Sequence, residues 1–169
     1  MINNKLTVGI TQGDGNGIGY EVIIKALADA RILDGFTPVI YGSSKIFGFY
    51  RKQIHNLEQL DTYVINSVKD AKIKKINILN CLPDNVYVEP GQATPDSAKS
   101  AITALERAVA DLKSGDIDVL VTGPINKRSM TNAGLGFTGH IEKLKQAFGV
   151  KDVAMFTTSS QLKLGVVIG

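Results

Sequence analysis

A glycine-rich turn near the N-terminus constrains the fold of this chain more than any other feature. Residues 11–21 read Thr-Gln-Gly-Asp-Gly-Asn-Gly-Ile-Gly-Tyr-Glu, with glycine at every second position from 13 to 19. An apolar run at residues 6–10 leads into the turn, and a helical pattern from Ile18 to Ile32 leaves it. This order is typical of the first strand-to-helix connection of an α/β domain.

Two interpretations of the turn remain open. Glycine lets the backbone take positive φ and approach another group closely, and that group is either a ligand or the neighbouring strand. The free amides of the following helix favour an anion or a polar ligand in the same crevice. The dinucleotide fingerprint is absent, because it needs glycine at position 18 or 20, where the chain has Ile18 and Tyr20. No Lys-Ser or Lys-Thr pair follows the glycines, so the turn is not a Walker loop either.

The composition excludes several classes of protein. A chain of 169 residues with 44% hydrophobic and 21% charged residues is long and apolar enough to form one buried domain. The net charge of +3 is too small, and the lysines too scattered, to indicate nucleic-acid binding. The single Cys81 excludes an internal disulfide and a cysteine-based metal cluster. No stretch approaches the ~18 apolar residues of a membrane span, and no signal peptide is evident, so we expect a cytoplasmic protein.

Apolar periodicity predicts alternating strands and helices. Strands are expected at 6–11, 37–42, 117–122 and 162–168, the last one buried, and helices at 17–32, 43–54, 94–114 and 141–148. Ser43 and Thr94 are expected to cap two of these helices, and Gly115 to end the longest. Between them, short strands at 63–65, 76–79 and 86–88 predict a peripheral β-rich segment at about 61–89.

Candidate site residues follow the strand at 117–122, because ligands bind beyond the carboxyl ends of parallel strands. Lys127 begins a short helix there, where a cation can hold a phosphate or carboxylate, although taken alone it is more simply a solvated lysine. His140 lies in a glycine-rich loop and is a candidate for substrate contact or proton transfer. His55 is expected only to complement a helix dipole. Cys81 has no histidine near it in sequence, so we expect no nucleophilic role for its thiol.

Three segments, in this order and spacing, resemble one enzyme family. They are the opening turn, Thr-Gly-Pro-Ile-Asn-Lys at 122–127, and the Ala-Gly-x-x-Phe-Thr-Gly-His-x-Glu loop at 133–142. Together they closely resemble the 4-hydroxythreonine-4-phosphate dehydrogenases of pyridoxal phosphate biosynthesis, over the whole chain. Isocitrate- and isopropylmalate-type dehydrogenases share the opening turn but not the Phe-Thr-Gly-His loop. The resemblance implies a three-layer α/β/α fold of the isocitrate/isopropylmalate dehydrogenase type with a mostly parallel sheet, and makes residues 1–169 the N-terminal portion of a longer, two-subdomain enzyme.

The resemblance also implies an activity. Members oxidise the 3-hydroxyl of 4-hydroxythreonine 4-phosphate with NAD and a divalent metal (Zn, Mg or Co), and the β-keto acid loses carbon dioxide to give 3-amino-2-oxopropyl phosphate. The metal would polarise the alcohol oxygen and then the ketone. His140 and Ile141 match the family's substrate-contacting pair, with isoleucine where threonine is usual, and we add Lys127 as a third candidate for substrate binding. The implied enzyme is a homodimer that binds a small phosphorylated amino acid, not nucleic acid or a membrane.

The family's metal-binding histidines and most of its cofactor contacts would lie beyond Gly169. Because His55 and His140 are the only histidines, the sequence assigns no metal or cofactor ligands within this chain, and we expect an inactive N-terminal fragment. One alternative is a non-catalytic protein that binds a phosphorylated small molecule through the turn at 13–19, Lys127 and His140. Another is an acyl-phosphate transferase, by analogy of fold.

Overall fold

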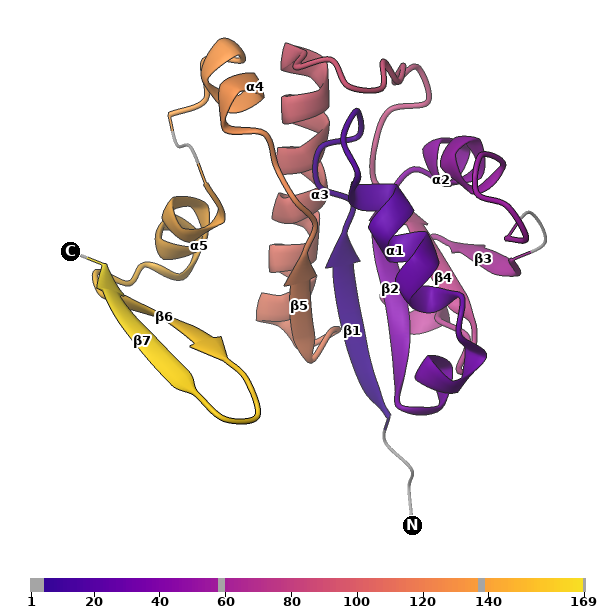
Figure 1. Cartoon of the computed structure of the whole chain (residues 1–169), viewed down its shortest axis with the longest axis horizontal. Coiled ribbons are helices and arrows are strands. Elements are labelled where there is room, and N and C mark those ends of the chain that lie inside the picture. The colour runs from indigo at the N-terminus through magenta and orange to yellow at the C-terminus, as the bar shows by residue number, and fades with distance from the viewer. Residues whose placement is uncertain (1–4, 58–59, 137–138, 169) are drawn as a thin grey trace.

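The computed structural model describes residues 5–57, 60–136 and 139–168 (Figure 1). Its elements in chain order are β1 (Leu6–Thr11), α1 (Gly19–Leu27), the 3-10 helix η1 (Ala30–Asp34), β2 (Phe36–Gly42), α2 (Ser44–Arg51), β3 (Thr62–Ile65), the 3-10 helix η2 (Val68–Asp70), β4 (Ile76–Asn80), α3 (Pro95–Ser114), β5 (Val119–Thr122), α4 (Lys127–Asn132), α5 (His140–Phe148), β6 (Val153–Thr158) and β7 (Lys163–Ile168). Among these residues, no helix is both long and apolar enough to cross a membrane.

In the described part of the chain, the central sheet has five strands in the order β3-β4-β2-β1-β5. Every neighbouring pair in it is parallel, as predicted. The carboxyl ends of β1 and β5 therefore lie side by side, and the segments that follow them rise from the same edge of the sheet (Figure 1). This edge is where parallel sheets bind ligands.

Helices cover both faces of this sheet, which confirms the three-layer α/β/α arrangement. On β2, Ile40 packs in the core cluster that contains Ile24 of α1 and Phe47 of α2. The next residue, Tyr41, points to the other face and packs in the cluster that contains Ala104 of α3. Successive residues of a strand point to opposite faces, so the interior strands are apolar on both sides.

The prediction of a peripheral β-rich segment at 61–89 is wrong for two of its three strands, which the structure forms as β3 and β4. Both belong to the central sheet, and β4 lies between β3 and β2. Ile78 and Leu79 are each 1% exposed and belong to the core clusters on opposite faces, as expected for an interior parallel strand. The third predicted strand, at 86–88, is irregular.

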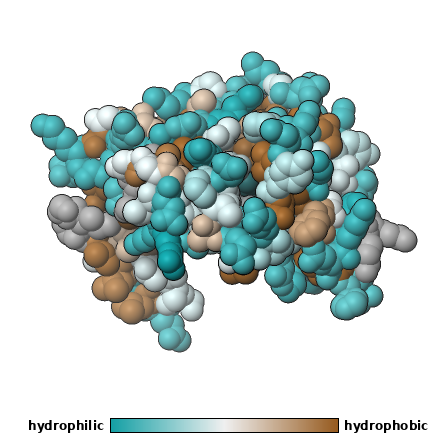
Figure 2. Space-filling model, turned by 90° about the horizontal axis from the view of Figure 1, so that it is seen from above, coloured by the Kyte–Doolittle hydropathy of each residue, from teal (hydrophilic) through white to brown (hydrophobic). Residues whose placement is uncertain are grey.

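Two other predictions are corrected. Helix α1 ends at Leu27 rather than Ile32, because Asp29 accepts a hydrogen bond from the Arg31 amide and starts the separate turn of η1. The strand at 162–168 was expected to be buried, but β7 pairs antiparallel with β6, which the sequence did not predict, in a hairpin apart from the central sheet (Figure 1). Leu164 is 54% exposed, and hydrophobic side chains gather at the end of the molecule that carries this hairpin (Figure 2).

A buried hydrogen bond joins β2 to α3. The Tyr41 hydroxyl donates to Oδ2 of Asp111 at 2.8 Å, and Arg107 Nε donates to the same carboxylate at 3.2 Å. Because Asp111→Ala leaves a buried hydroxyl unpaired, we expect it to lower the free energy of unfolding by about 1–3 kcal/mol, measured by urea denaturation. Asp96→Ala, at an exposed carboxylate of the same helix, is the control and should cost about 0.5 kcal/mol or less. Equal stabilities of the two variants would contradict the prediction.

Candidate functional site

The turn after β1 and the segment after β5 are joined through their backbones. The Gly123 amide donates to the Thr11 carbonyl at 3.0 Å, and the Asp14 amide donates to the Pro124 carbonyl at 2.8 Å. Gly13 has φ +71, and a Cβ there would overlap the Pro124 carbonyl oxygen. Gly13 is therefore required by the close approach of the neighbouring backbone.

The four glycines of the turn have different roles. A Cβ on Gly19 would overlap the Gln12 carbonyl oxygen, so Gly19, like Gly13, serves packing. A Cβ on Gly15 or Gly17 would meet no heavy atom closer than 3.6 Å and 3.4 Å, respectively. Gly17 instead lines two cavities. Gly13 and Gly19 thus fit the packing interpretation, Gly17 lies where a ligand could approach, and Gly15 lines neither cavity.

The first cavity lies between three segments at the carboxyl edge of the sheet. It has a volume of about 350 Å³ and is lined by residues 14 and 16–18 of the turn, by 91–92, and by 124–126 after β5. A second cavity of about 380 Å³ shares residues 16–18 and Gly91 with it and extends to Tyr50. The two cavities together form a hollow across the carboxyl ends of neighbouring strands.

Asn16 holds one wall of the first cavity. Its Nδ2 donates to the Gln92 carbonyl and to Oγ1 of Thr94, both at 3.0 Å, and its Oδ1 accepts from the Glu89 amide at 2.8 Å. Thr94 also caps α3 by accepting from the Ser97 amide at 3.2 Å. Asn16 thus attaches the connection from β4 to α3 onto the opening turn. The sequence did not single out Asn16, because these partners are more than 70 residues away in the chain.

Asp14 places a buried carboxylate in the lining of the first cavity. The residue is 5% exposed; its Oδ1 accepts from the Asn16 amide at 2.9 Å, and its Oδ2 accepts from Ser129 Oγ at 3.4 Å. Among the described residues that line the two cavities, none is lysine, arginine or histidine. The first cavity therefore has one carboxylate and no basic side chain among its described lining residues.

His140 lies beside the end of β5, on the predicted side of the sheet. It is the first residue of α5, it is half-buried, and it forms a hydrogen bond with the Gly123 backbone. Burial lowers the pKa of the His140 ring, and the bond to Gly123 opposes this only in part. Ile141 follows on the same helix and is also half-buried. The ring is therefore neutral at pH 7 and sits next to the wall of the first cavity.

Lys127 lies beside this site but not in it. It is exposed at the start of α4, whose cap is Asn126, the acceptor of the Arg128 and Ser129 amides at 2.9 Å and 3.2 Å. Asn126 lines the first cavity, whereas Lys127 lines neither cavity. The structure thus brings His140 and the opening turn to one segment, 123–126, and leaves the lysine at its outer end.

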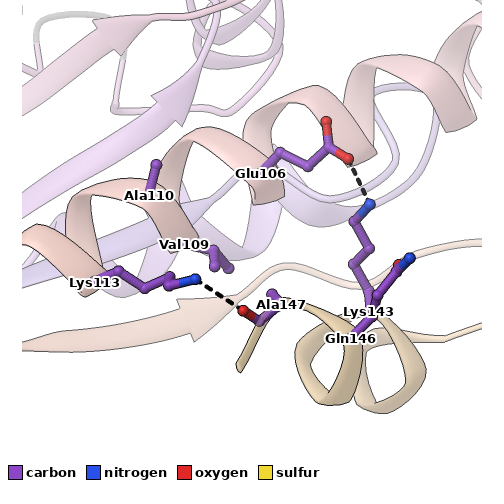
Figure 3. A pocket seen from close by; sticks show the side chains of 7 residues that line it. All are labelled: Glu106, Val109, Ala110, Lys113, Lys143, Gln146 and Ala147. Atoms are coloured by element: carbon purple, nitrogen blue, oxygen red, sulfur yellow. Dashed lines mark hydrogen bonds and ion pairs between the residues drawn. The ribbon is translucent and has the colours of Figure 1, made fainter. Parts of the chain in front are cut away.

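A further cavity, of about 320 Å³, lies between α3 and α5. Figure 3 shows Lys143 pointing toward Glu106, with a 2.5 Å ion pair, and Lys113 pointing toward the Ala147 carbonyl, to which it donates at 2.9 Å. Since these charged groups bind other residues of its own lining, we interpret the cavity as a gap in helix packing. The contacts hold α5 against α3 and thereby fix the position of His140.

The remaining candidates lie elsewhere. His55 is exposed, four residues past the end of α2 at Arg51, so α2 is shorter than predicted. Burial raises the pKa of the Cys81 thiol to about 11, which keeps it protonated at neutral pH. The described residues include no group of three His, Cys, Asp or Glu side chains that could hold a metal ion.

Comparisons with known proteins agree on one family. The model of the family described as "Pyridoxal phosphate biosynthetic protein PdxA" matches residues 34–168. The 4-hydroxythreonine-4-phosphate dehydrogenase of Bacteroides thetaiotaomicron is 40% identical over 149 residues, 88% of this chain and 40% of that protein. A putative D-threonate 4-phosphate dehydrogenase of Clostridium botulinum is 29% identical over 164 residues, 90% of this chain and 46% of that protein.

Solved structures give the same result. The crystal structure of a 4-hydroxythreonine-4-phosphate dehydrogenase from Burkholderia phymatum is similar with a TM-score of 0.83 and 28% identity. The match covers 96% of this chain and 49% of that one. This chain therefore spans about half the length of the relatives it matches.

Proposed function

The chain belongs to the PdxA family of pyridoxal phosphate biosynthetic proteins, and we propose that it is the N-terminal, substrate-contacting portion of a 4-hydroxythreonine-4-phosphate dehydrogenase. The observation that supports this most is the position of His140, which bonds to the Gly123 backbone at the carboxyl end of β5. In an open parallel sheet this is the edge that faces the ligand.

The proposed reaction is the oxidation of a small phosphorylated amino acid. Carbon 3 of 4-hydroxythreonine 4-phosphate transfers a hydride to NAD while its hydroxyl gives a proton to a base, and the resulting β-keto acid releases carbon dioxide to give 3-amino-2-oxopropyl phosphate. NAD, a divalent metal ion (Zn, Mg or Co), a homodimer and a cytoplasmic location are parts of the proposal for the complete enzyme. The described residues of this chain do not fit a metal site, so we assign no metal-dependent step to them.

Three residues of this chain have proposed roles in holding the substrate. A neutral His140 that donates its N–H to the Gly123 carbonyl leaves its other ring nitrogen free to accept a proton from a substrate hydroxyl. Ile141, half-buried on the same helix, would contact the carbon chain of the substrate. Exposed Lys127 would neutralise part of the phosphate charge from the outer end of the segment after β5.

Binding of the phosphorylated substrate tests this proposal. We expect 4-hydroxy-L-threonine 4-phosphate to bind the chain, and His140→Ala to weaken binding by about 10- to 100-fold, because one hydrogen bond to a neutral imidazole is lost at a partly buried site. Isothermal titration calorimetry would measure the affinity, and thermal melting would confirm that the variant folds. His55→Ala is the control and should bind like the wild type. Equal affinities for the wild type and His140→Ala would exclude the assigned role.

The same preparation distinguishes the alternatives. NADH formation that depends on added metal would support dehydrogenase activity in the chain itself. Saturable binding without turnover would favour a binding role or an incomplete enzyme. A requirement for coenzyme A would indicate an acyl-phosphate transferase instead.

A further inference from the structure

A separate cavity, which we call the outer cavity, lies between residues 83–89 of the connection from β4 to α3 and the N-terminal half of α3. Its volume of about 430 Å³ is in the range of sites for small molecules. It shares no lining residue with the two cavities at the carboxyl edge of the sheet. We propose that the outer cavity is a binding site for a small organic cation. This inference goes beyond the proposed dehydrogenase and does not depend on it.

The first support is the hydroxyl of Ser100, a residue of α3 that is 7% exposed and lines the outer cavity. Nearby on the helix, the Ser97 hydroxyl donates to the Thr94 carbonyl at 2.9 Å, and Thr103 Oγ1 donates to the carbonyl of residue 99 at 3.0 Å. Within the described chain the Ser100 hydroxyl has no such partner, and it is not among the side-chain atoms that are both unpartnered and sealed from solvent. It therefore opens into the cavity with its hydrogen bonds left for a ligand.

The second support is an excess of negative charge in the lining. Nζ of Lys99 is 3.9 Å from Oδ1 of Asp96, so these two exposed charges offset each other. Glu89 also lines the cavity, and none of the ion pairs between described residues includes its carboxylate. Its amide donates to Oδ1 of Asn16 at 2.8 Å, which fixes its backbone while its exposed side chain stays available. The lining therefore attracts a cation and repels an anion.

The third support is an aromatic ring in the same lining. Tyr87 is 83% exposed, the highest fraction among the large hydrophobic side chains of the described chain. The face of a tyrosine ring attracts an ammonium group, and its apolar surface can cover the carbon skeleton of a ligand. An organic cation would thus donate hydrogen bonds to Glu89 and Ser100 and pack its apolar part on Tyr87.

The outer cavity and the first cavity share one connection as a wall. Residues 89 and 94 line the outer cavity, and residues 91–92 line the first. The Asn16 side chain bonds to residues 89, 92 and 94 and so anchors both ends of this short connection. A ligand in the outer cavity would contact the anchored ends. Since binding stabilises the structure that a ligand contacts, we expect the amides of the wall to exchange more slowly with solvent when the cavity is occupied.

The test uses benzylammonium chloride as the probe and benzyl alcohol as a neutral compound of similar shape. Each is titrated into the ¹⁵N-labelled chain, and binding is followed by amide chemical shifts. We expect saturable shifts with benzylammonium at residues 86–89 and 99–103, and at least about 5-fold weaker binding of benzyl alcohol. At saturation with benzylammonium, amides of residues 89–94 should exchange at least about 3-fold more slowly.

Three variants assign the binding to the cavity. Glu89→Gln should weaken benzylammonium binding by at least about 5-fold, because it removes the unpaired charge. Ser100→Ala should weaken it by about 3-fold or more, because it removes a hydrogen bond. Asp84→Asn removes an exposed negative charge from the same connection but outside the lining, so it should bind within about 2-fold of the wild type. Thermal melting would confirm that each variant folds.

Comparison of the two probes needs only the wild type. Equal affinity for benzylammonium and benzyl alcohol, or no saturable shift with benzylammonium, would overturn the inference. Shifts confined to residues 14–18 and 124–126, or equal losses in Asp84→Asn and Glu89→Gln, would also overturn it. None of these results decides the dehydrogenase proposal, which is tested separately at His140.

Discussion

Gly13→Ala is expected to lower the free energy of unfolding by about 3–5 kcal/mol, the upper end of single-substitution effects. Gly13 has φ +71, which costs an alanine roughly 1–2 kcal/mol, and the new Cβ would overlap the Pro124 carbonyl oxygen. The clash would also break the 2.8 Å bond between Asp14 and Pro124. Chemical denaturation followed by circular dichroism would measure the loss.

Two glycines provide matched controls for this effect. Gly15 has no positive φ, and a Cβ added there would meet no heavy atom closer than 3.6 Å. Gly15→Ala should therefore lower the free energy of unfolding by about 1 kcal/mol or less. Gly91 has φ +81 with nothing within 4 Å, so Gly91→Ala measures the backbone strain alone, about 1–2 kcal/mol. If Gly13→Ala costs no more than Gly91→Ala, contact with the segment after β5 is not what requires glycine at position 13.

Local signals predicted the elements that depend on local interactions. Helix α3 begins after Thr94, whose side chain accepts from the Ser97 amide, and ends at Gly115, whose φ of 80 is the left-handed conformation that a glycine stop allows. Ser43 caps α2 in the same way. These signals need only a few neighbouring residues, so they can be read without the tertiary structure.

Features that depend on distant partners were not predictable. The run at 76–80 is short, and only its pairing with both β2 and β3 makes it an interior strand. Likewise, the apolar residues of β7 predicted burial, but in the described chain that strand pairs with β6 alone. Hydrophobicity indicates that a strand can be buried, and its neighbours decide whether it is.

The candidate site also combines features that the sequence predicts with features that depend on distant residues. Parallel topology was enough to expect His140 near the end of β5, where it is found. The cavity beside Asp14 was not expected, because its walls come from three segments and its carboxylate lies within a turn that the sequence characterises mainly by glycine. No spacing rule connects residue 16 with residues 89–94, so only the folded chain reveals that Asn16 holds one wall.

Asn16→Ala is therefore expected to cost about 2–4 kcal/mol of unfolding free energy, since it removes three hydrogen bonds and leaves the Gln92 carbonyl and the Glu89 amide without these partners. Asn85→Ala, at an exposed position of the same connection, should cost about 0.5 kcal/mol or less. Urea denaturation measures both values.

The three hydrogen bonds of the Asn16 side chain should also affect local hydrogen exchange, which the free energy of unfolding does not report. Once Asn16 no longer holds residues 89–94, their amides should exchange with solvent faster than in Asn85→Ala, while the amides of the central sheet remain protected. If residues 89–94 exchange as slowly in Asn16→Ala as in the wild type, the connection is held by other contacts, and the hydrogen bonds of Asn16 are not what fixes this wall of the cavity.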